Sequence, residues 1–254
     1  MSEETTVENV ESVENVESTQ EQPAPKKKKK PVISDNLVEI LVAVFLGLTA
    51  LLTAWASWIS SLHGGNQATN YTQSNNLASE GNSEYNAGMQ LYLSDLMAWN
   101  TLMEYVYDGL IAESKGDTEE YALIEQKAEE FKEQNSSWIL AEGLEWMDEN
   151  DSYSPFAMPG IIDLYYIDAN ALLEESRQYL EQGKIDNAHG DAYNLVSVIY
   201  SVVLFMLGIV GIFKRIPNRF AVLLIAVVGL VLTTIYMCTI PLPTGFNIAS
   251  FFGG

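Results

Sequence analysis

The chain has very little cysteine, positive charge or histidine. Cys238 is the only cysteine among the 254 residues, which excludes a disulfide scaffold. Only 13 Lys and Arg residues stand against 34 Asp and Glu, so the net charge is −21. Phosphate recognition needs a basic surface, and we therefore expect no nucleic-acid partner.

Motifs that carry catalysis or cofactor binding are also missing. The chain has no G-x-S-x-G, no P-loop, no G-x-G-x-x-G, and neither H-E-x-x-H nor paired cysteines for zinc. Asp148–Ser152 resembles the start of a calcium loop, but Tyr153 and Pro159 occupy the positions that need Gly and a bidentate Glu. The prediction is a protein that is not an enzyme, with no cofactor and no small-molecule substrate.

Two histidines remain as weak candidates for a metal site. His63 and His189 each lie close to the end of an apolar run, so they are expected to be neighbours, with Asp191 nearby. Histidines at such positions are also common at the membrane interface without any ligand. The metal hypothesis therefore rests on His63, His189 and Asp191 alone.

Three long apolar runs dominate the sequence. They cover 37–59, 195–213 and 220–240, and Glu39 is their only charged residue. A helix rises about 1.5 Å per residue, so roughly 20 apolar residues cross a bilayer core of about 30 Å. Three transmembrane helices are predicted. The long segment before the first run favours a retained anchor over a cleaved signal peptide.

Basic residues flank these runs on one side. A lysine block precedes the first run, and a basic turn at 214–219 links the second and third. These topology residues are Lys26, Lys27, Lys28, Lys29, Lys30, Lys214, Arg215 and Arg219. The predicted location is the cytoplasmic (inner) cell membrane, multi-pass, with a cytoplasmic N-terminus and with loop 60–194 and the C-terminal tail 241–254 outside. Residues 1–36, which repeat V-E-N-V-E-S and end in the lysine block, are expected to form a disordered acidic tail.

The loop 60–194 has apolar spacings of three, four and seven, which are typical of helices. It carries 25 acidic and five basic residues. The fold class is therefore an all-α membrane protein with an acidic helical extracytoplasmic domain between the first and second transmembrane helices. Gly81 and Gly88 fall on one helix face, where they predict either close helix packing or a kink.

Several boundaries inside this domain are predicted from local signals. Asp117 followed by Glu120 starts one helix, whose apolar stripe is Tyr121, Ile124 and Phe131. Ser136 or Ser137 caps the next helix, and a further helix over 161–182 ends at Gly183. The helix that Ser136 or Ser137 caps is expected to bury Trp138, Leu140, Leu144 and Met147.

Other side chains are expected to act at the membrane. Trp55, Trp58 and Tyr193 lie near the predicted outer boundary, where amphipathic rings favour the headgroup zone. Small residues permit close approach of membrane helices. The predicted packing glycines are Gly208, Gly211 and Gly229.

Two long stretches resemble a known family. GGNQATNYTQSNNLASEGNSEYNAGMQLY (64–92) follows the first span, and GDAYNLVSVIYSVVLFMLGI (190–209) opens the terminal hairpin. Together with the order of the segments, they resemble bacterial three-span membrane proteins of unknown function. The resemblance covers residues 37–240 and implies architecture only.

The function expected from these observations is non-enzymatic. The outer helical domain would mediate assembly or partner binding, with the lipid bilayer and either a second copy or another membrane protein as partners. The alternative is an oligomeric channel or transport-accessory subunit, in which the acidic domain attracts cations to an outer vestibule.

Overall fold

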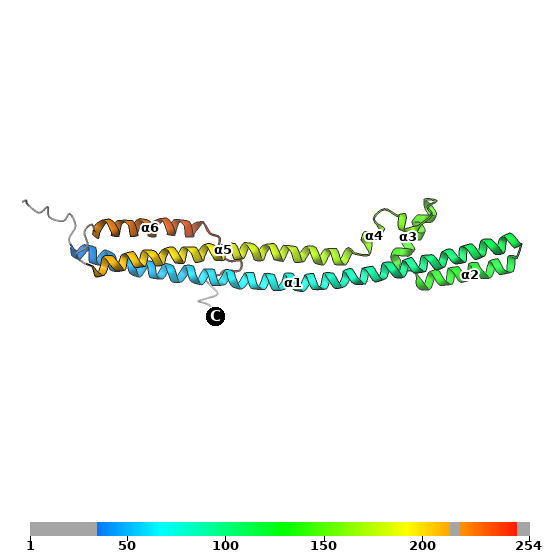
Figure 1. Cartoon of the computed structure of the whole chain (residues 1–254), viewed down its shortest axis with the longest axis horizontal. Helices are drawn as coiled ribbons and strands as arrows, with labels where there is room; N and C mark the ends of the chain where they lie inside the picture. Colours follow the sequence, from blue (N-terminus) through cyan, green and yellow to red (C-terminus); the bar gives the residue numbers. More distant parts are fainter. Residues whose placement is uncertain (1–34, 214–218, 248–254) are drawn as a thin grey trace, which may run out of the picture.

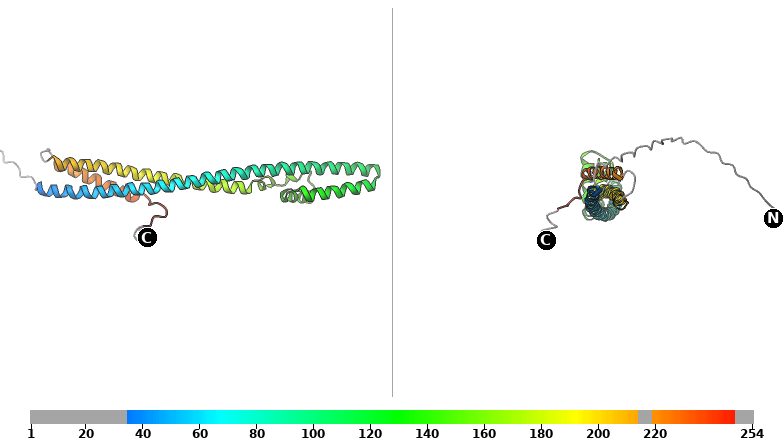
Figure 2. Two further views of the ribbon diagram at one scale, coloured as in Figure 1. Left: turned by 90° about the horizontal axis from the view of Figure 1, so that it is seen from below. Right: turned by 90° about the vertical axis from the view of Figure 1, so that its left-hand side faces the viewer.

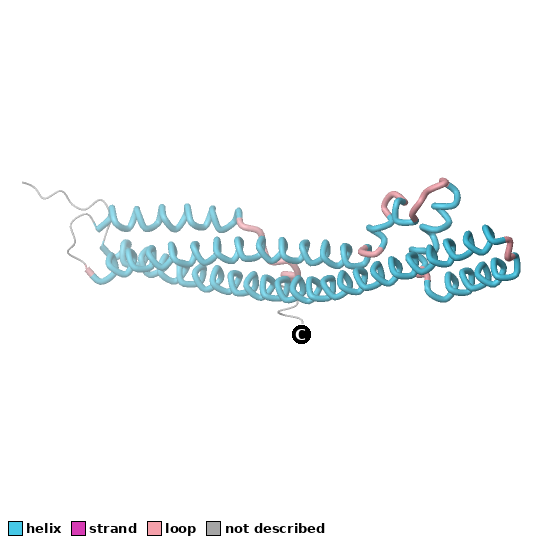
Figure 3. Tube along the Cα trace, turned by 45° about the vertical axis from the view of Figure 1, so that its right-hand side comes forward, coloured by secondary structure: helices cyan, strands magenta, loops and turns pink. Residues whose placement is uncertain are grey.

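A computed structural model describes residues 35–213 and 219–247, and the predicted acidic tail and lysine block lie outside this part. The described residues are overwhelmingly helical and contain no strand, which confirms the all-α prediction (Figures 1 and 3). The elements are α1 (Asp35–Lys115), α2 (Thr118–Asn135), α3 (Trp138–Glu149), the 3₁₀ turn η1 (Pro155–Ala157), α4 (Ile161–Leu164), α5 (Ile167–Ile212) and α6 (Arg219–Thr239).

Helix α1 is a single uninterrupted helix of 81 residues. At 1.5 Å per residue it is about 120 Å long, so the first apolar run and the following polar segment form one continuous rod. The predicted kink at Gly81 and Gly88 does not occur, and the alternative of close packing holds. A Cβ on Gly81 would lie 2.9 Å from Leu173 of α5, and a Cβ on Gly88 would overlap the carbonyl oxygen of Tyr165.

Helix α5 runs antiparallel to α1 along most of the rod (Figures 1 and 2). Its predicted end at Gly183 is wrong, because the helix continues through Gly183 into the second apolar run and ends at Ile212. The Tyr71 ring of α1 occupies the place where a Cβ on Gly183 would sit. Glycine therefore permits close helix approach here, although its usual cost in a helix is about 1 kcal/mol.

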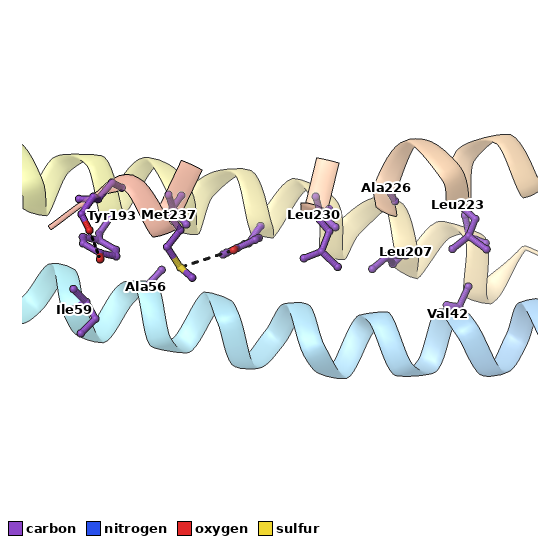
Figure 4. Close-up of a cluster of buried hydrophobic side chains, with 14 of the residues drawn as sticks. Val42, Ala56, Ile59, Tyr193, Leu207, Leu223, Ala226, Leu230 and Met237 are labelled. Carbon is purple, nitrogen blue, oxygen red and sulfur yellow. Dashed lines mark hydrogen bonds between the residues drawn. The ribbon is translucent and has the colours of Figure 1, made fainter. Parts of the chain in front are cut away.

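The three apolar runs come together at one end of the rod (Figure 4). Three helices are long and apolar enough to cross a membrane, namely α1, α5 and α6, which confirms that part of the prediction. In the most apolar 18-residue stretch of each of these helices, between 17% and 28% is buried inside the molecule. The core between them includes Val42, Ala56, Tyr193, Leu207 and Leu230. Many other apolar side chains of the three helices are exposed on the outside of the bundle.

The opposite end of the rod carries the shorter helices. Asp117 caps α2, as predicted, since its carboxylate accepts a hydrogen bond from the Glu120 N–H at 3.0 Å. Ser137, rather than Ser136, caps α3 by accepting from the Leu140 N–H at 3.2 Å. Both caps were predicted from the spacing of residues along the chain, and both predictions are confirmed.

The burial predicted for α3 holds only in part. Leu140 and Leu144 are buried and Met147 is half-buried, but Trp138 is 61% exposed. Ile139, which was not among the residues predicted to be buried, is buried. The side of α3 that faces α1 and α4 carries Ile139, Leu140, Gly143 and Leu144, which are spaced three or four residues apart. Trp138 lies outside this face.

The packing at Gly88 gives the first prediction. Gly88→Ala is expected to destabilise the rod by about 1–3 kcal/mol, because the added methyl group meets backbone of the α4–α5 junction, which cannot rotate away. Gly64→Ala is the matched control, since nothing lies within 4 Å of its Cβ position and alanine favours the helix by about 1 kcal/mol. Thermal unfolding of the purified protein in lipid nanodiscs checks both. Equal shifts of the two variants would contradict the close contact.

Candidate functional site

A buried polar cluster joins three segments where the apolar runs end. His63 of α1 is 1% exposed, and its Nδ1 lies 3.1 Å from Oδ1 of Asp186 on α5. Its Nε2 lies 3.2 Å from the carbonyl oxygen of Pro241, just beyond α6. Both neighbours are hydrogen-bond acceptors, so each ring nitrogen of His63 faces an oxygen that can accept a hydrogen bond.

Further hydrogen bonds complete this cluster, which we call the His63 layer. Asp186 is 1% exposed and also accepts from Asn70 Nδ2 at 3.0 Å and from Gln182 Nε2 at 3.4 Å. Tyr193 donates to the Ile240 carbonyl oxygen at 3.2 Å. The layer therefore ties α1, α5 and the segment after α6 together through side chains.

The structure brings the two histidines together but pairs them with a different carboxylate. The rings of His63 and His189 are 5.3 Å apart, centre to centre, as neighbours. Asp191 points elsewhere and accepts from Asn187 at 3.3 Å, whereas Asp186 takes the place beside His63. No group of three or more His, Cys, Asp or Glu side chains within residues 35–213 and 219–247 is arranged to hold a metal ion.

The predicted interface aromatics lie at the same level of the rod. Trp55 and Trp58 contact each other edge to face at 5.4 Å, and both contact Phe246 beyond α6. Tyr193 is only 2% exposed, so its ring packs between helices rather than facing outward. Its burial beside His63 gives it a role in joining segments.

The other predicted membrane residues differ in their surroundings. A Cβ on Gly211 would contact Val42 and one on Gly229 would contact Val203, each at 3.4 Å, whereas Gly208 has open space. Among the basic topology residues only Arg219 belongs to the described part. It starts α6, is 7% exposed and donates from Nε to the Val210 carbonyl oxygen at 2.8 Å.

A second buried carboxylate organises the far end of the rod. Asp95 of α1 is 1% exposed and accepts hydrogen bonds from the Ser137 N–H at 3.0 Å, from the Ser137 hydroxyl, and from the Tyr165 hydroxyl at 2.8 Å. Burial, together with the hydrogen bond to Asp95 and its negative charge, raises the pKa of the Tyr165 phenol well above its ordinary value. Asp95 thereby attaches both α3 and the α4–α5 junction to α1.

Beyond Asp95, the end of α1 and helix α2 form a hairpin that we call the distal hairpin (residues 99–135). Helix α2 buries none of its residues completely, and of its predicted apolar stripe only Phe131 packs against the buried cluster that includes Leu102 and Leu140. Tyr121 is 38% exposed, while Ile124 and Phe131 are half-buried. A two-helix hairpin has too few neighbours to cover its own apolar side chains.

An open groove of about 240 Å³ runs between the two helices of this hairpin and is called the distal groove. Its lining is mostly apolar, with one carboxylate. Val106 and Leu110 on α1 are 50% and 54% exposed. The lining residues are Tyr105, Val106, Gly109, Leu110, Tyr121, Ile124, Glu125 and Ala128.

Sequence reasoning identified neither Asp95 nor the distal groove. A signal for the groove was present, because Val106 and Leu110 are spaced by four and therefore share a face of α1. For Asp95 the signal was a single carboxylate among apolar neighbours, which does not distinguish a buried acid from an exposed one.

The architecture consists of two helices joined at the His63 layer, with a third apolar helix beside them. An acidic hairpin lies at the far end of the rod. Comparison with protein-family models, curated proteins and solved structures found no match for this chain. The resemblance to bacterial three-span membrane proteins therefore stays an expectation from the sequence.

Proposed function

We propose that this chain is a non-enzymatic membrane protein that holds a binding hairpin at a distance from the bilayer. The single observation that supports this most is the continuity of α1, which runs without interruption from the first apolar run into the first helix of the distal hairpin. From the end of that run at Ile59 to the end of the helix at Lys115, the rise corresponds to about 80 Å. A surface at that distance is suited to contact another macromolecule.

The contacts along the rod support a role in positioning. The His63 layer connects α1, α5 and the segment after α6, and Asp95 connects α1 to α3 and the α4–α5 junction. Between the two, the hydroxyls of Ser74 and Ser176 lie 3.2 Å apart in a buried contact. A rod joined at three levels transmits the orientation of its membrane end to the hairpin.

The proposed topology follows the placement of basic residues. Loop 60–194 lies outside the cytoplasmic membrane, and the N-terminus and the turn at 214–219 lie inside. In this arrangement the exposed apolar faces of α1, α5 and α6 contact lipid, which removes their apolar surface from water at roughly 25 cal/mol per Å². The acidic residues of the rod then face the exterior.

One experiment tests location and binding together. In a Cys238→Ala background, Gln126→Cys on the distal hairpin and Gln178→Cys in the first part of α5 both place an exposed thiol on the rod. Intact cells are treated with a membrane-impermeant maleimide that carries a photoreactive group. We expect equal labelling at both positions, and after illumination a discrete adduct from position 126 that position 178 does not form.

Each outcome of this experiment supports or overturns one part of the proposal. Labelling only after the cells are permeabilised would overturn the outer location. Labelling without an adduct from position 126, or equal adducts from both positions, would overturn the proposal that the hairpin is the binding surface. Cation-selective currents from the reconstituted protein, with no adduct in cells, would favour the channel alternative.

A further inference from the structure

The distal groove has the shape and chemistry to take up a helix. It lies between α1 and α2, is lined mostly by apolar side chains from both, and is partly open to solvent. An amphipathic helix buries its apolar face in a groove of this kind by placing side chains at i, i+3, i+4 and i+7. The half-exposed Val106, Leu110 and Tyr121 are the surfaces that such a helix would cover.

The charges around the groove are of one sign. Residues 99–135 contain ten acidic and three basic side chains, a net charge of −7. Glu125 lines the groove, and Glu129 follows one turn later on the same side of α2. Glu113 follows Leu110 by three residues and Val106 by seven, which places it on the same face of α1, one turn beyond the groove. Acidic side chains from both helices thus lie around an apolar centre.

This charge pattern decides between the candidate occupants. A second copy of the hairpin would bring another net charge of −7 against the first, and like charges placed together across an interface oppose association. An anionic lipid surface is repelled for the same reason. A helix with an apolar face bordered by Lys and Arg matches both the centre and the edges of the groove.

The geometry points to the distal groove as the docking site for a basic amphipathic helix of a partner protein. This inference rests on the proposed binding function and adds the site and the chemistry of the partner. Apolar burial in the groove supplies most of the affinity, and the carboxylates at its edges increase the association rate and exclude acidic helices.

A synthetic probe tests the inference on the full chain in phosphatidylcholine nanodiscs. The probe is a fluorescent 18-residue peptide of Leu and Lys, with Leu at i, i+3, i+4 and i+7 and Lys along both edges. Fluorescence anisotropy measures its binding, with empty nanodiscs as the blank. A peptide of the same composition in scrambled order is the peptide control. We expect the amphipathic peptide to bind at least tenfold more tightly than the scrambled one.

Matched variants locate the binding site. Leu110→Gln alters a groove residue that is 54% exposed, and Leu123→Gln alters a leucine of α2 that is 56% exposed but does not line the groove. We expect Leu110→Gln to weaken binding about tenfold, since one leucine loses its burial, and Leu123→Gln to change it less than twofold. Glu125→Gln should weaken binding about threefold at low salt, and Glu133→Gln less.

Three results would overturn the inference. They are equal binding of the scrambled peptide, equal weakening by Leu110→Gln and Leu123→Gln, and no binding at all. A partner adduct from position 126 in cells, together with any of these results, would leave the binding function intact and reject only the basic helix as its partner. Absence of both would reject the two proposals together.

Discussion

Replacing Asp95 with alanine is expected to destabilise the distal half of the rod by about 3–5 kcal/mol. The substitution leaves three donors without their acceptor, namely the half-buried Ser137 N–H and Ser137 hydroxyl and the buried Tyr165 hydroxyl, at roughly 1–2 kcal/mol each. Ser137 also caps α3, so its loss of position weakens the start of that helix. Hydrogen exchange of the α3 amides should accelerate about 100-fold or more in the purified protein.

Two other variants separate the hydrogen bonds from the charge. Asp108→Ala changes an exposed carboxylate of the same helix and should alter exchange in α3 only slightly. Asp95→Asn keeps an acceptor but removes the negative charge, so the pKa of Tyr165 should fall toward its ordinary value while α3 stays largely protected. Unchanged exchange in Asp95→Ala would show that Asp95 does not hold α3.

Local signals explain why part of this fold is predictable from sequence. The three apolar runs are long, and their length and composition alone indicate helices able to cross a membrane. The cap at Asp117 depends on a carboxylate and an N–H three residues apart, so it needs no tertiary information. These two features depend only on neighbours along the chain, and both predictions are confirmed.

Features that depend on distant residues were missed or misplaced. The buried positions of α5 recur every three or four residues from Gly183 through Asp186, Gly190 and Tyr193 into the apolar run. The buried face of α5 includes a glycine and a carboxylate, which are unusual in a helix core and obscured the continuity of the helix in the sequence. Asp191 was therefore expected beside His63, in place of Asp186. The partners of Asp95, Ser137 and Tyr165, lie 42 and 70 residues away in the chain, and no local pattern specifies them.

The distal groove illustrates a different limit. Periodicity indicates that Tyr121 and Ile124 share the apolar face of α2. It does not indicate whether the chain itself provides enough surface to cover that face. Only the arrangement in space shows that α2 packs against α1 and leaves an open groove between the two helices. An uncovered stripe at the far end of a long rod is what motivates the binding proposal.

The second large effect is expected at the His63 layer. Asp186→Leu removes the acceptor for His63 Nδ1, Asn70 Nδ2 and Gln182 Nε2 in a buried setting, and should destabilise the protein by about 3–5 kcal/mol. Asp191→Leu, an exposed position five residues further along α5, is the matched control and should change the free energy of unfolding by less than about 0.5 kcal/mol.

A double variant distinguishes a specific pair from a general packing defect. When His63→Leu is added to Asp186→Leu, no histidine is left unpaired, so the combined loss should be clearly smaller than the sum of the two single losses. Thermal unfolding in nanodiscs, followed by tryptophan fluorescence to which Trp55 and Trp58 beside the layer contribute, measures all four proteins. Additive losses would show that His63 and Asp186 act independently. A coupling of 1 kcal/mol or more would establish the pair as the joint between the membrane helices and the rod.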